Sequence, residues 1–566
     1  NRIGNPNIVN DISIASYGTH YGYRIDNVLP SNGNFISDTL VNMTFSNTAE
    51  NSFFLGIYTT SGGPDSNTVQ QCVISEIKSA GAMTTIDYTN PFENAIVGIW
   101  YFSSGNGQAI KNNSISGLRA TSLTGTPKIT GIQLARSNLA LELNVYDNTI
   151  SDLTNIAVNA SSNPGIIGLH LNNVQDTPIN LINNRISISN GNNTNAVDIY
   201  GIYDNLITSG SGSANKFIYH NSIAISGNSS DNSTSFAFFI ESNGNTLRLR
   251  NNILHNSRTS GSGGQYAIGN DNLATAWTSA SSNYNDLYSS NPATIGAWPV
   301  GTSKSFADWK TISSCDLNSV TIPVSFTNIA SDLHVTALSN CGIEGKGTPL
   351  AGIINDIDGD VRNIVTPDLG ADEFTAICEV QVNVKVFIQG FMISSSMMVA
   401  CNNPINEPLH CDTIILKIAM PNSPYTTLYS DTAILLTNGN VQFSIPQVYL
   451  GNSYFFAIKH RNSIETWSVA PQTISNGMFY DFSTAASKAY QNNQVNIGSG
   501  VYAIYSGDVD QDNSVDLSDL TDVESNSQLT SYGYFSCDLT GDNKCESTDY
   551  SLVENNYNGG VMVKKP

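Results

Sequence analysis

Asn183-Asn184-Arg185-Ile186 is one copy of a short phrase that recurs through the first 300 residues and decides the fold of this chain. The other clear copies are Asn112-Asn113-Ser114-Ile115, Asp147-Asn148-Thr149-Ile150, His220-Asn221-Ser222-Ile223, Asn251-Asn252-Ile253-Leu254 and Tyr284-Asn285-Asp286-Leu287. Each places an asparagine two residues before an aliphatic side chain. Asp26-Asn27-Val28-Leu29 and Gln71-Cys72-Val73-Ile74 are weaker copies. From Ile74 to Leu287 the aliphatic position recurs every 31 to 41 residues, which indicates an internal repeat of irregular length.

The residues around the phrase alternate as in β-strands. Leu141-Glu142-Leu143-Asn144-Val145 precedes one copy, and further upstream lies a second apolar run, Gly131-Ile132-Gln133-Leu134. Several β-rich runs per repeat, with no helical period between them, are typical of a parallel β-helix. In that architecture inward aliphatic residues stack into a continuous core, and equivalent asparagines can form an amide ladder. We therefore expect an all-β, multidomain chain in which residues 1–300 form a parallel β-helix. Because the chain begins within a repeat, we expect this β-helix to lack its N-terminal part.

Two further phrases follow the repeats, Asn355-Asp356-Ile357-Asp358-Gly359-Asp360-Val361-Arg362 and Pro367-Asp368-Leu369-Gly370-Ala371-Asp372-Glu373-Phe374. Together they resemble the closing motif of right-handed β-helix proteins found on bacterial surfaces. The resemblance implies that residues 301–378 form the end of the β-helix and cap its last coil. The aspartates at 356, 358 and 360 could bind calcium, but a turn in which Arg362 pairs with a carboxylate is the favoured interpretation.

Residues 379–502 show a strict alternation of period two. Val380, Val382 and Val384 alternate with polar residues, as do Val441 and Phe443, and turn sequences such as Asn438-Gly439-Asn440 separate the runs. This pattern predicts a β-sandwich.

The last domain, residues 503–566, holds two acidic loops of twelve residues, 508–519 and 538–549. In both, oxygen-bearing side chains recur at the positions that a hard cation such as calcium needs, and position 7 offers a backbone carbonyl. The predicted metal ligands are Asp508, Asp510, Asp512, Ser514 through its carbonyl, Asp516 and Asp519 in the first loop, and Asp538, Thr540, Asp542, Lys544 through its carbonyl, Glu546 and Asp549 in the second. Asn513 and Asn543 replace the usual glycine at position 6, because asparagine tolerates a left-handed backbone. We expect two Ca²⁺ sites.

Each loop is followed by an apolar run, such as Leu517, Leu520 and Val523 after the first, so residues 503–566 resemble a dockerin module. The resemblance implies two loop–helix units held by calcium, and some dockerins dock onto a cohesin partner. A disordered acidic tail is the alternative. The order of the domains and the ending Val561-Met562-Val563-Lys564-Lys565-Pro566 resemble the C-terminal region of type IX secretion cargo. That resemblance implies export and anchoring by the secretion or outer-membrane machinery.

Composition favours a protein outside the cell. Only 12% of the 566 residues are charged, and 24 Lys and Arg against 46 Asp and Glu give a net charge of −22. This balance argues against nucleic acid as a partner, because phosphate binding depends on basic patches. No run of about eighteen apolar residues predicts a transmembrane helix.

Eight cysteines suit either disulfides in an exported protein or buried free thiols. Candidate pairs are Cys315 with Cys341, Cys401 with Cys411, and Cys537 with Cys545, whereas Cys72 and Cys378 have no obvious mate.

Many β-helix proteins are polysaccharide lyases or glycoside hydrolases, which need clustered carboxylates. Candidate acids are Asp198, Asp204, Glu241 and Asp271, none of them adjacent in sequence, although acids on neighbouring coils could meet in space. His170 and His220 are interpreted as structural, and Trp100, Tyr101, Tyr200 and Tyr203 as either sugar-stacking or packing aromatics.

The sequence therefore predicts an exported, non-catalytic adhesin or structural stalk at the cell surface, with a calcium-stabilised C-terminal region and surface glycans as further candidate ligands. A carbohydrate-active β-helix enzyme with accessory modules is the alternative.

Overall fold

The computed structural model describes residues 2–3, 12–14, 19–26, 34–46, 48, 53–61, 67–81, 96–103, 108–123, 125–135, 142–156, 165–172, 174, 178–189, 197–205, 215–228, 232–241, 246–259, 262–271, 277–278, 280–401, 405–529 and 533–566. The chain forms two compact units, Asn1–Ala376 and Ile377–Pro566. The described residues are predominantly β, with three α-helices.

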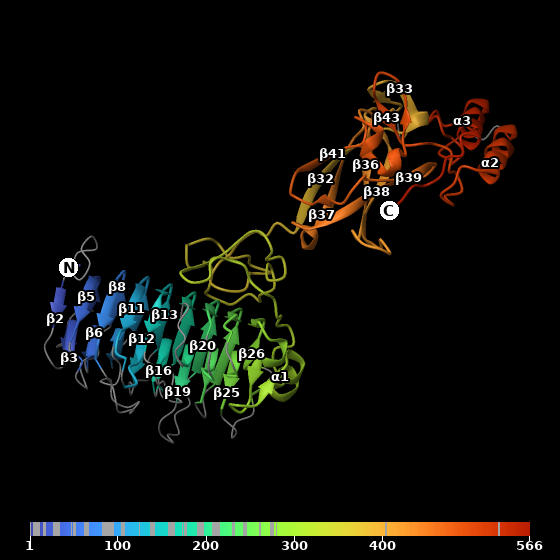
Figure 1. Ribbon diagram of the computed structural model, residues 1–566. Helices are drawn as coiled ribbons and strands as arrows, with labels where there is room; N and C mark the ends of the chain where they lie inside the picture. Colours follow the sequence, from blue (N-terminus) through green and yellow to red (C-terminus); the bar gives the residue numbers. More distant parts are fainter. Residues whose placement is uncertain are drawn as a thin grey trace. The chain divides into compact units, whose positions relative to one another are not determined.

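The first unit is a parallel β-helix whose strands repeat along three sheets, here called A, B and C (Figure 1). Sheet A contains β1 (Arg2–Ile3), β2 (Ile12–Ile14), β5 (Thr39–Phe45), β8 (Val73–Ser79), β11 (Ser114–Ala120), β14 (Thr149–Ile150), β15 (Leu153–Asn155), β18 (Arg185–Ser189), β21 (Ser222–Ser226), β24 (Ile253–Asn256) and β27 (Asp286–Ser289). Sheet B contains β3 (Thr19–Asp26), β6 (Phe53–Ser61), β9 (Ile96–Ser103), β12 (Ile129–Ala135), β16 (Ile166–Asn172), β19 (Ile199–Asn205), β22 (Ser235–Ile240), β25 (Gln265–Asn270), β28 (Gly296–Ala297) and β29 (Ser303–Lys304). Sheet C contains β4 (Asn34–Ile36), β7 (Asn67–Gln70), β10 (Gln108–Lys111), β13 (Leu143–Tyr146), β17 (Ile179–Ile182), β20 (Asn215–Tyr219), β23 (Thr246–Arg250) and β26 (Ser282–Asn283).

The recurring phrase forms the turn from sheet C to sheet A. Its second residue is a buried asparagine, and a ladder of side-chain amides runs from Asn113 through Asn148, Asn184, Asn221 and Asn252 to Asn285, with Nδ2–Oδ1 distances of 2.8 to 3.0 Å. The residue before each ladder asparagine has a left-handed backbone, with φ between 53° and 58°. The predicted ladder is confirmed. The weaker copy at Gln71-Cys72 adopts the same turn, and the backbone N–H of Cys72 donates to Asn113 Oδ1 at 2.9 Å. Residues 27–29 lie outside the described part of the chain.

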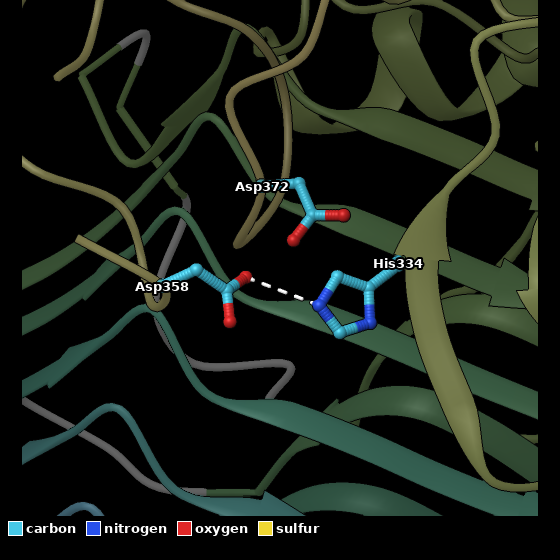
Figure 2. A group of neighbouring side chains, drawn as sticks. All are labelled: His334, Asp358 and Asp372. Carbon is cyan, nitrogen blue, oxygen red and sulfur yellow. Dashed lines mark ion pairs between the residues drawn. The ribbon is translucent and has the colours of Figure 1, made fainter. Parts of the chain in front are cut away.

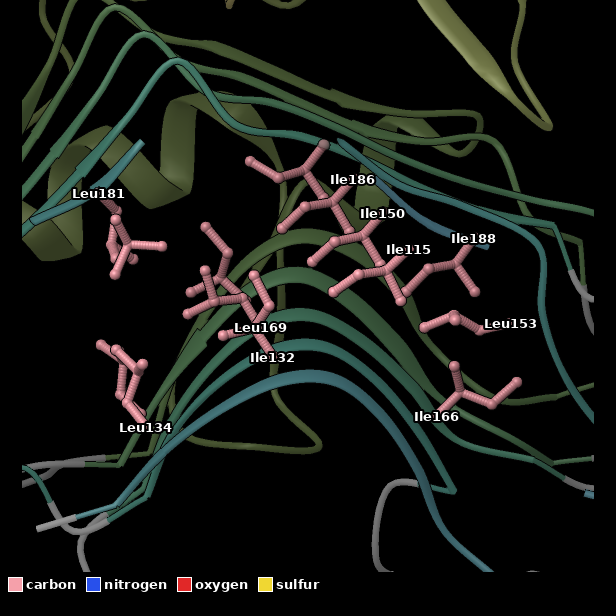
Figure 3. Close-up of a cluster of buried hydrophobic side chains, with 14 of the residues drawn as sticks. Ile115, Ile132, Leu134, Ile150, Leu153, Ile166, Leu169, Leu181, Ile186 and Ile188 are labelled. Atoms are coloured by element: carbon pink, nitrogen blue, oxygen red, sulfur yellow. The ribbon is translucent and has the colours of Figure 1, made fainter. Parts of the chain in front are cut away.

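The aliphatic position of the phrase builds the core. Ile74, Ile115, Ile150, Ile186, Ile223, Leu254 and Leu287 are in direct register on successive coils, and all are buried. Figure 3 shows Ile115, Ile150 and Ile186 stacked in one row. A continuous apolar column of this kind lets each coil bury its hydrophobic face only against its neighbours.

A second column, on sheet B, consists of small residues. Gly98, Gly131, Gly168 and Gly201 follow one another on successive coils. A Cβ added at Gly168 would lie 2.4 Å from Ile186 Cγ2 and 2.6 Å from the backbone oxygen of Gly201. The glycines therefore allow sheet B to approach the aliphatic column closely.

Residues 301–376 cover two different parts of the β-helix. Helix α1 (Phe306–Ser313) packs beside the last coils, and Trp309 is buried in the same apolar core as Ile295 and Trp298. The phrases of the closing motif instead lie against the outer face of sheet A. Gly370 donates its N–H to the oxygen of Asn251 at 2.7 Å, and Ala371 donates to Ser222 Oγ at 2.9 Å. This motif therefore covers the side of the β-helix rather than its end. Strands β30 (Phe326–Asn328) and β31 (Asp332–Val335) form a hairpin, and η2 (Pro292–Thr294) is a short 3-10 turn.

The second unit has two sheets that share one hydrophobic core. One contains β37 (Asn440–Pro446), β32 (Glu379–Lys385) and β41 (Met478–Asp481). The other contains β36 (Thr427–Leu436), β35 (His410–Ala419), β38 (Ser453–His460), β39 (Ser463–Trp467) and β40 (Gln472–Thr473). Small pairs are formed by β33 (Met392–Ser394) with β34 (Met397–Met398) and by β42 (Val495–Asn496) with β43 (Tyr502–Ala503). The 3-10 turns are η3 (Gln389–Phe391), η4 (Gln447–Tyr449), η5 (Ala486–Lys488) and η6 (Tyr490–Asn492).

The period-two pattern of β32 places Val380, Val382 and Val384 in this core, fully buried, as the alternation predicts. Helices α2 (Leu517–Gln528) and α3 (Ser547–Asn558) pack together through Val523 and Val553, which are also buried. The described residues of this region, 503–529 and 533–566, thus contain two helices, each preceded by an acidic loop, where the alternative interpretation expects no regular structure.

The cysteines divide between the two interpretations. Cys537 and Cys545 form a disulfide. Cys315, Cys401 and Cys411 are buried free thiols, so the pairings of Cys315 with Cys341 and of Cys401 with Cys411 are not formed. Burial raises the pKa of Cys401 to about 12.

Candidate metal centre

The first acidic loop leads directly into helix α2. Asp516 is the N-cap of α2, and its Oδ1 accepts from the N–H of Ser518 at 2.8 Å. Asn513 has a φ of 80°, which explains why asparagine stands where such loops carry glycine. The loop therefore bends back on itself and brings its two ends together.

Asp519, at position 12, holds the loop in this shape. Its Oδ1 accepts from the N–H groups of Val509 at 2.7 Å and Asp510 at 3.3 Å, and its Oδ2 accepts from Asp516 at 2.9 Å. The side chain is fully buried. Because these bonds tie the backbone of positions 2, 3 and 9 to the side chain of position 12, the carboxylate of Asp519 closes the first loop.

Three of the predicted ligands meet inside this loop. Asp508, Asp510 and Asp519 each offer a carboxylate oxygen, and these oxygens lie within 4.8 Å of one another. Asp508 is 2% exposed, and its Oδ1 is buried without a hydrogen-bond partner. Burial raises the pKa of Asp508 to about 7, and repulsion from Asp519 and Asp512 adds to the rise. A cation among these oxygens would relieve both the desolvation and the repulsion.

The other predicted ligands of the first loop shape its turns. Asp512 Oδ1 accepts from the N–H of Ser514 at 2.8 Å, and Asp516 caps α2. The structure gathers the carboxylates of positions 1, 3 and 12 into one group, and the carboxylates of Asp512 and Asp516 are not part of it. The fit to calcium therefore rests on three carboxylates and one unpartnered oxygen.

The second loop repeats this closure. Asp549 Oδ1 accepts from Leu539 at 2.8 Å and Thr540 at 2.9 Å, and its Oδ2 accepts from Glu546 at 2.8 Å. These are positions 2, 3 and 9, as in the first loop. Asn543 has a φ of 64°. The two loops have the same spacing of residues in the sequence, and in the structure they have the same hydrogen-bond pattern.

Asp538, at position 1 of the second loop, is fully buried but has different surroundings from Asp508. Its Oδ1 accepts from Gly541 at 2.7 Å, and its Oδ2 accepts from Asn543 at 3.0 Å. The guanidinium of Arg461 lies 3.8 Å from Oδ2. Burial raises the pKa of Asp538 to about 6, and the charge of Arg461 opposes the rise. Hydrogen bonds from the protein and the charge of Arg461 therefore already stabilise the carboxylate of Asp538, as a bound calcium ion would.

Asp542, Lys544 and Glu546 make further contacts in the second loop, and the backbone N–H of Asp542 donates to Asp538 Oδ1 at 3.2 Å. Asp542 Oδ1 accepts from the N–H of Lys544 at 3.0 Å, and the ammonium of Lys544 lies 3.7 Å from Asp542 Oδ2. Glu546 precedes α3 as its N-cap residue. The disulfide between Cys537 and Cys545 joins the residue before position 1 to position 8. The second loop is thus held by covalent and charge contacts that the first loop lacks.

A buried charge cluster, missed by sequence reasoning, supports the second loop from the turn between β38 and β39. Asp412 accepts from His460 Nε2 at 3.1 Å, from Arg461 Nε at 3.0 Å and from the hydroxyl of Tyr534. Asn462 donates to the backbone oxygen of Asp538 at 2.8 Å. Burial acts to raise the pKa of Asp412, but the hydrogen bond from His460 and the charge of Arg461 hold it well below its usual range. Nothing in the sequence pairs Asp412 with a turn almost fifty residues later.

A second acidic group lies in the first unit, where Figure 2 shows His334, Asp358 and Asp372 converging. His334 Nε2 is 3.2 Å from Asp358 Oδ2. The guanidinium of Arg185 pairs with both aspartates and lies 3.0 Å from His334 Nε2. Because an arginine already neutralises these oxygens, the group is an ion-pair cluster that holds the closing motif against β18.

The favoured interpretation of the closing motif is confirmed. Asp356 Oδ1 accepts from the N–H groups of Asp358 at 2.9 Å and Asp360 at 2.8 Å, so it forms a turn. Arg362 pairs with Glu373 at 3.3 Å.

The candidate catalytic acids of the β-helix are each engaged. Asp204 binds the ammonium of Lys216, with both oxygens at 2.6 Å, and the pair is fully buried. Glu241 accepts from the hydroxyl of Tyr203 at 2.9 Å. Asp198 accepts from the N–H of Thr234 at 2.6 Å, and Asp271 from that of Val300 at 3.1 Å.

Two of these acids lie on neighbouring coils. Ile240 and Asn270 are in register, so Glu241 and Asp271 follow equivalent strand ends. Burial raises the pKa of Glu241, and the charge of Asp271 contributes to the rise.

The histidines and aromatics named from the sequence are packed inside. His170 and His220 are buried, and burial lowers the pKa of His170 to about 3. Trp100, Tyr101, Tyr200 and Tyr203 are 1 to 7% exposed. They pack rather than present faces to solvent, so the sugar-stacking interpretation of these four residues is wrong.

Comparisons with known proteins add no relative. No family model matches the chain, and neither the curated proteins nor the solved structures contain a match to it. Among the described residues, no helix is both long and apolar enough to cross a membrane.

Proposed function

We propose that this chain is an exported, non-catalytic surface protein in which a β-helix stalk or adhesive body precedes a calcium-binding C-terminal unit. The observation that carries the calcium part is the unpartnered buried Oδ1 of Asp508 beside the carboxylates of Asp510 and Asp519. Those three residues would hold the ion. Bound calcium would supply the positive charge that this group of acids lacks.

The body of the molecule supports the stalk part of the proposal. A β-helix with a continuous apolar column and an amide ladder suits an elongated scaffold, because each coil contacts only the coils next to it. The composition, with 12% charged residues, and the disulfide between Cys537 and Cys545 favour a location outside the cell. A dockerin-like role in docking or in recognition by export and anchoring machinery belongs to the same proposal.

The calcium part is tested by titration of the full chain. Wild type, Asp508→Asn and Asp519→Asn are compared with Asp522→Asn, which removes an exposed acid from α2. We expect the first two substitutions to abolish binding at the first loop and the third to leave it unchanged. Equal calcium stoichiometry in all four proteins would contradict the proposal.

The export part is tested with the same variants in cells that make the protein. Surface exposure is measured by adding protease to intact cells. If the calcium-loaded unit is the element that the export machinery recognises, Asp508→Asn reduces the surface fraction while the β-helix remains folded inside. Undiminished export of a variant that no longer binds calcium would contradict that role.

A carbohydrate-active enzyme is the second candidate, and the pair Glu241 and Asp271 is the observation that favours it. A carboxyl group whose pKa is raised by burial beside a second carboxylate suits acid–base chemistry on a glycosidic bond. Incubation with neutral and acidic polysaccharides, followed by analysis of chain length, decides the question. Shortened products that disappear in Glu241→Gln but persist in Asp198→Asn would favour the enzyme over the stalk.

A further inference from the structure

The outer side of sheet C carries two rows of side chains that run along the β-helix. In β10, β13, β17, β20 and β23, buried residues alternate with more exposed ones, so every second side chain points away from the core. The strand register aligns these outward residues from coil to coil, about 4.8 Å apart. One row is Ala109, Asn144, Asn180, Phe217 and Arg248, and the other is Lys111, Tyr146, Ile182, Tyr219 and Arg250. These ten residues are called the sheet C face below.

The sheet C face is basic, although the chain as a whole is strongly acidic. Its ten residues include three of the 24 Lys and Arg residues of the chain and no Asp or Glu, whereas the net charge of the chain is −22. Glu142 precedes β13 and accepts from the amide of Asn180, so one acid adjoins the face. A local excess of positive charge of this kind attracts anionic ligands.

The two guanidinium groups of the face bind backbone oxygens. Arg248 Nη1 donates to the backbone oxygen of Leu247 at 3.0 Å. Arg250 donates to the backbone oxygens of Leu249 at 3.0 Å and Ala280 at 2.7 Å. These acceptors are neutral, so they orient the guanidinium groups without cancelling their charge.

Acidic residues near the two arginines are few. The segments that precede β20 and β23, residues 206–214 and 242–245, contain no Asp or Glu. Burial lowers the pKa of Arg250, whereas Tyr219 and Asp316 oppose that change. Asp316 is itself fully buried and also accepts from Trp309 Nε1 at 2.9 Å. The charge of Arg250 is therefore partly balanced from inside the protein.

Aromatic rings lie between the cations of the sheet C face. Tyr146 and Tyr219 belong to the same row and are two coils apart, which separates their backbones by roughly 10 Å. The rings of Phe217 and Tyr219 are neighbours, with centroids 5.8 Å apart. Lys111 Nζ lies 5.6 Å from the ring centroid of Tyr146. An aromatic ring can contact the apolar face of a sugar while an adjacent cation binds a carboxylate on that sugar.

We propose that the sheet C face binds an acidic polysaccharide whose chain runs parallel to the axis of the β-helix. The strand spacing of about 4.8 Å is close to the length of one sugar residue in an extended chain, so successive sugars meet successive coils. The aromatic rings contact the sugar rings, and Lys111, Arg248 and Arg250 bind the carboxylates.

This site deepens the adhesin part of the proposed function and rests on it, because it names the class of glycan that the body would recognise. The site includes neither Glu241 nor Asp271, the acids that favour the enzyme candidate. It is also independent of calcium, since the predicted calcium ligands belong to residues 508–549.

The full chain is titrated calorimetrically with a hexamer of 1,4-linked galacturonic acid, with the methyl ester of that hexamer and with a single-stranded hexanucleotide of DNA. No calcium is added, because uronates themselves bind calcium through their carboxylates. We expect the acid hexamer to bind at least tenfold more tightly than either of the other two ligands. Equal affinities for the acid and the ester, tighter binding of the DNA, or no binding of the acid would overturn the proposal.

Two variants locate the binding. Arg248→Gln removes one charge of the face, and Tyr219→Ala removes one ring. Arg119→Gln is the control for the first, because Arg119 lies on β11 of sheet A and already pairs with Asp152. Tyr557→Ala, which removes an exposed ring from α3, is the control for the second.

We expect Arg248→Gln to weaken binding of the acid at least fivefold and to change binding of the ester little. Tyr219→Ala should weaken binding of both compounds, and the two controls should bind as wild type does. Circular dichroism reports folding, and if Tyr219→Ala fails to fold, Arg248→Gln alone carries the test. If Arg248→Gln binds the acid as wild type does, the sheet C face is not the site.

Calcium titration of the same samples separates this site from the calcium part of the proposed function. A chain that binds calcium at the first loop but no acidic hexamer refutes the sheet C face and leaves the calcium site intact. A chain that binds the hexamer through Arg248 but binds no calcium supports the sheet C face and contradicts the calcium part.

Discussion

Asn148 donates from its side-chain nitrogen to the side-chain oxygen of Asn184, 2.9 Å away on the next coil. Asn184 in turn donates to Asn221 at 2.9 Å and to the backbone oxygen of Val145 at 3.0 Å, and its own Oδ1 also accepts from the N–H of Asn148 at 3.2 Å. Each amide thus serves the turn of its own coil and that of its neighbours. The asparagine of the repeat is a structural residue that fixes the spacing of the coils.

Replacement of one ladder residue should therefore affect three coils. Asn184→Ala removes the acceptor of the backbone and side-chain N–H groups of Asn148 and the donor to the backbone oxygen of Val145 in a buried turn, whereas Asn221 Oδ1 still accepts from the backbone N–H of residue 184. Since each unsatisfied buried group costs about 1–3 kcal/mol, we expect a loss of about 2–4 kcal/mol, measured by urea unfolding followed through the β-sheet circular dichroism. The control is Asn180→Ala, which removes a partly exposed amide bonded to Asn144 on sheet C. A similar loss of unfolding free energy in both variants would show that the ladder does not stabilise the β-helix more than other amide pairs do.

The glycine column of sheet B should resist even a single methyl group. Gly168→Ala places a Cβ against Ile186 Cγ2 and the oxygen of Gly201, so overpacking should cost about 1–3 kcal/mol in the same unfolding measurement. Ala237 occupies the next place in this column after Gly201 and already carries a methyl group. Ala237→Gly is therefore the control, and we expect it to cost below about 1 kcal/mol through added backbone freedom. Equal tolerance of both substitutions would contradict close packing of the column.

Much of the first unit could be predicted because its period is local. The phrase around Asn184 and Ile186 repeats in sequence, and stacking of equivalent residues follows directly from the repeat. The position of the closing motif could not be predicted in this way. Whether Gly370 lies over the end or the side of the β-helix is decided by contacts with Ser222 and Asn251, more than one hundred residues earlier.

The candidate metal site likewise has a part that could be predicted from the sequence and a part that could not. The spacing from Asp508 to Asp519 predicts a closed loop, because the closure is made within twelve residues. The difference between the two loops could not be predicted. It arises from Arg461, which reaches Asp538 from a turn of the second unit's larger sheet. Sequence spacing describes the loop itself but not the charges that surround it.

Calcium binding should depend on pH through Asp508. Without the ion, the folded-state pKa of Asp508, about 7, lies above the ordinary aspartate value of 3.8, so the folded unit holds a proton that the unfolded chain releases. This stabilises the ion-free unit at low pH, and the contribution is lost as pH rises through about 7. Calcium requires the deprotonated carboxylate, so protons compete with it.

We therefore expect the calcium affinity of the first loop to fall about tenfold between pH 8 and pH 6, as follows from one proton with a pKa of about 7. Asp538, with a pKa of about 6, should give only about a twofold change at the second loop over the same range. Isothermal titration at both pH values, with Asp538→Asn to isolate the first loop, measures the difference. An affinity for the first loop that does not change with pH would show that Asp508 is not a ligand.

The buried carboxylate of Asp412 should be the group on which the second loop depends most. Asp412→Asn keeps the shape of the side chain but removes the charge that faces Arg461 and accepts from His460. Breaking one partner of a buried ion pair typically costs about 3–5 kcal/mol, so we expect a loss of about 3 kcal/mol in the second unit at pH 7. Thermal unfolding of the full chain measures it, and Asp522→Asn, which changes an exposed acid, should shift the transition little.

The pH dependence of this loss distinguishes charge from packing. The folded-state pKa of Asp412 is held below its ordinary value, so its charge contributes stability above the unfolded-state pKa of 3.8, and that contribution is lost as pH falls through the folded-state value. The stability difference between wild type and Asp412→Asn should therefore shrink when both are unfolded at pH 3 instead of pH 7. If this stability difference is the same at pH 7 and pH 3, Asp412 acts through the shape of its side chain. Arg461 would then support the loop at Asp538 without the charge of Asp412.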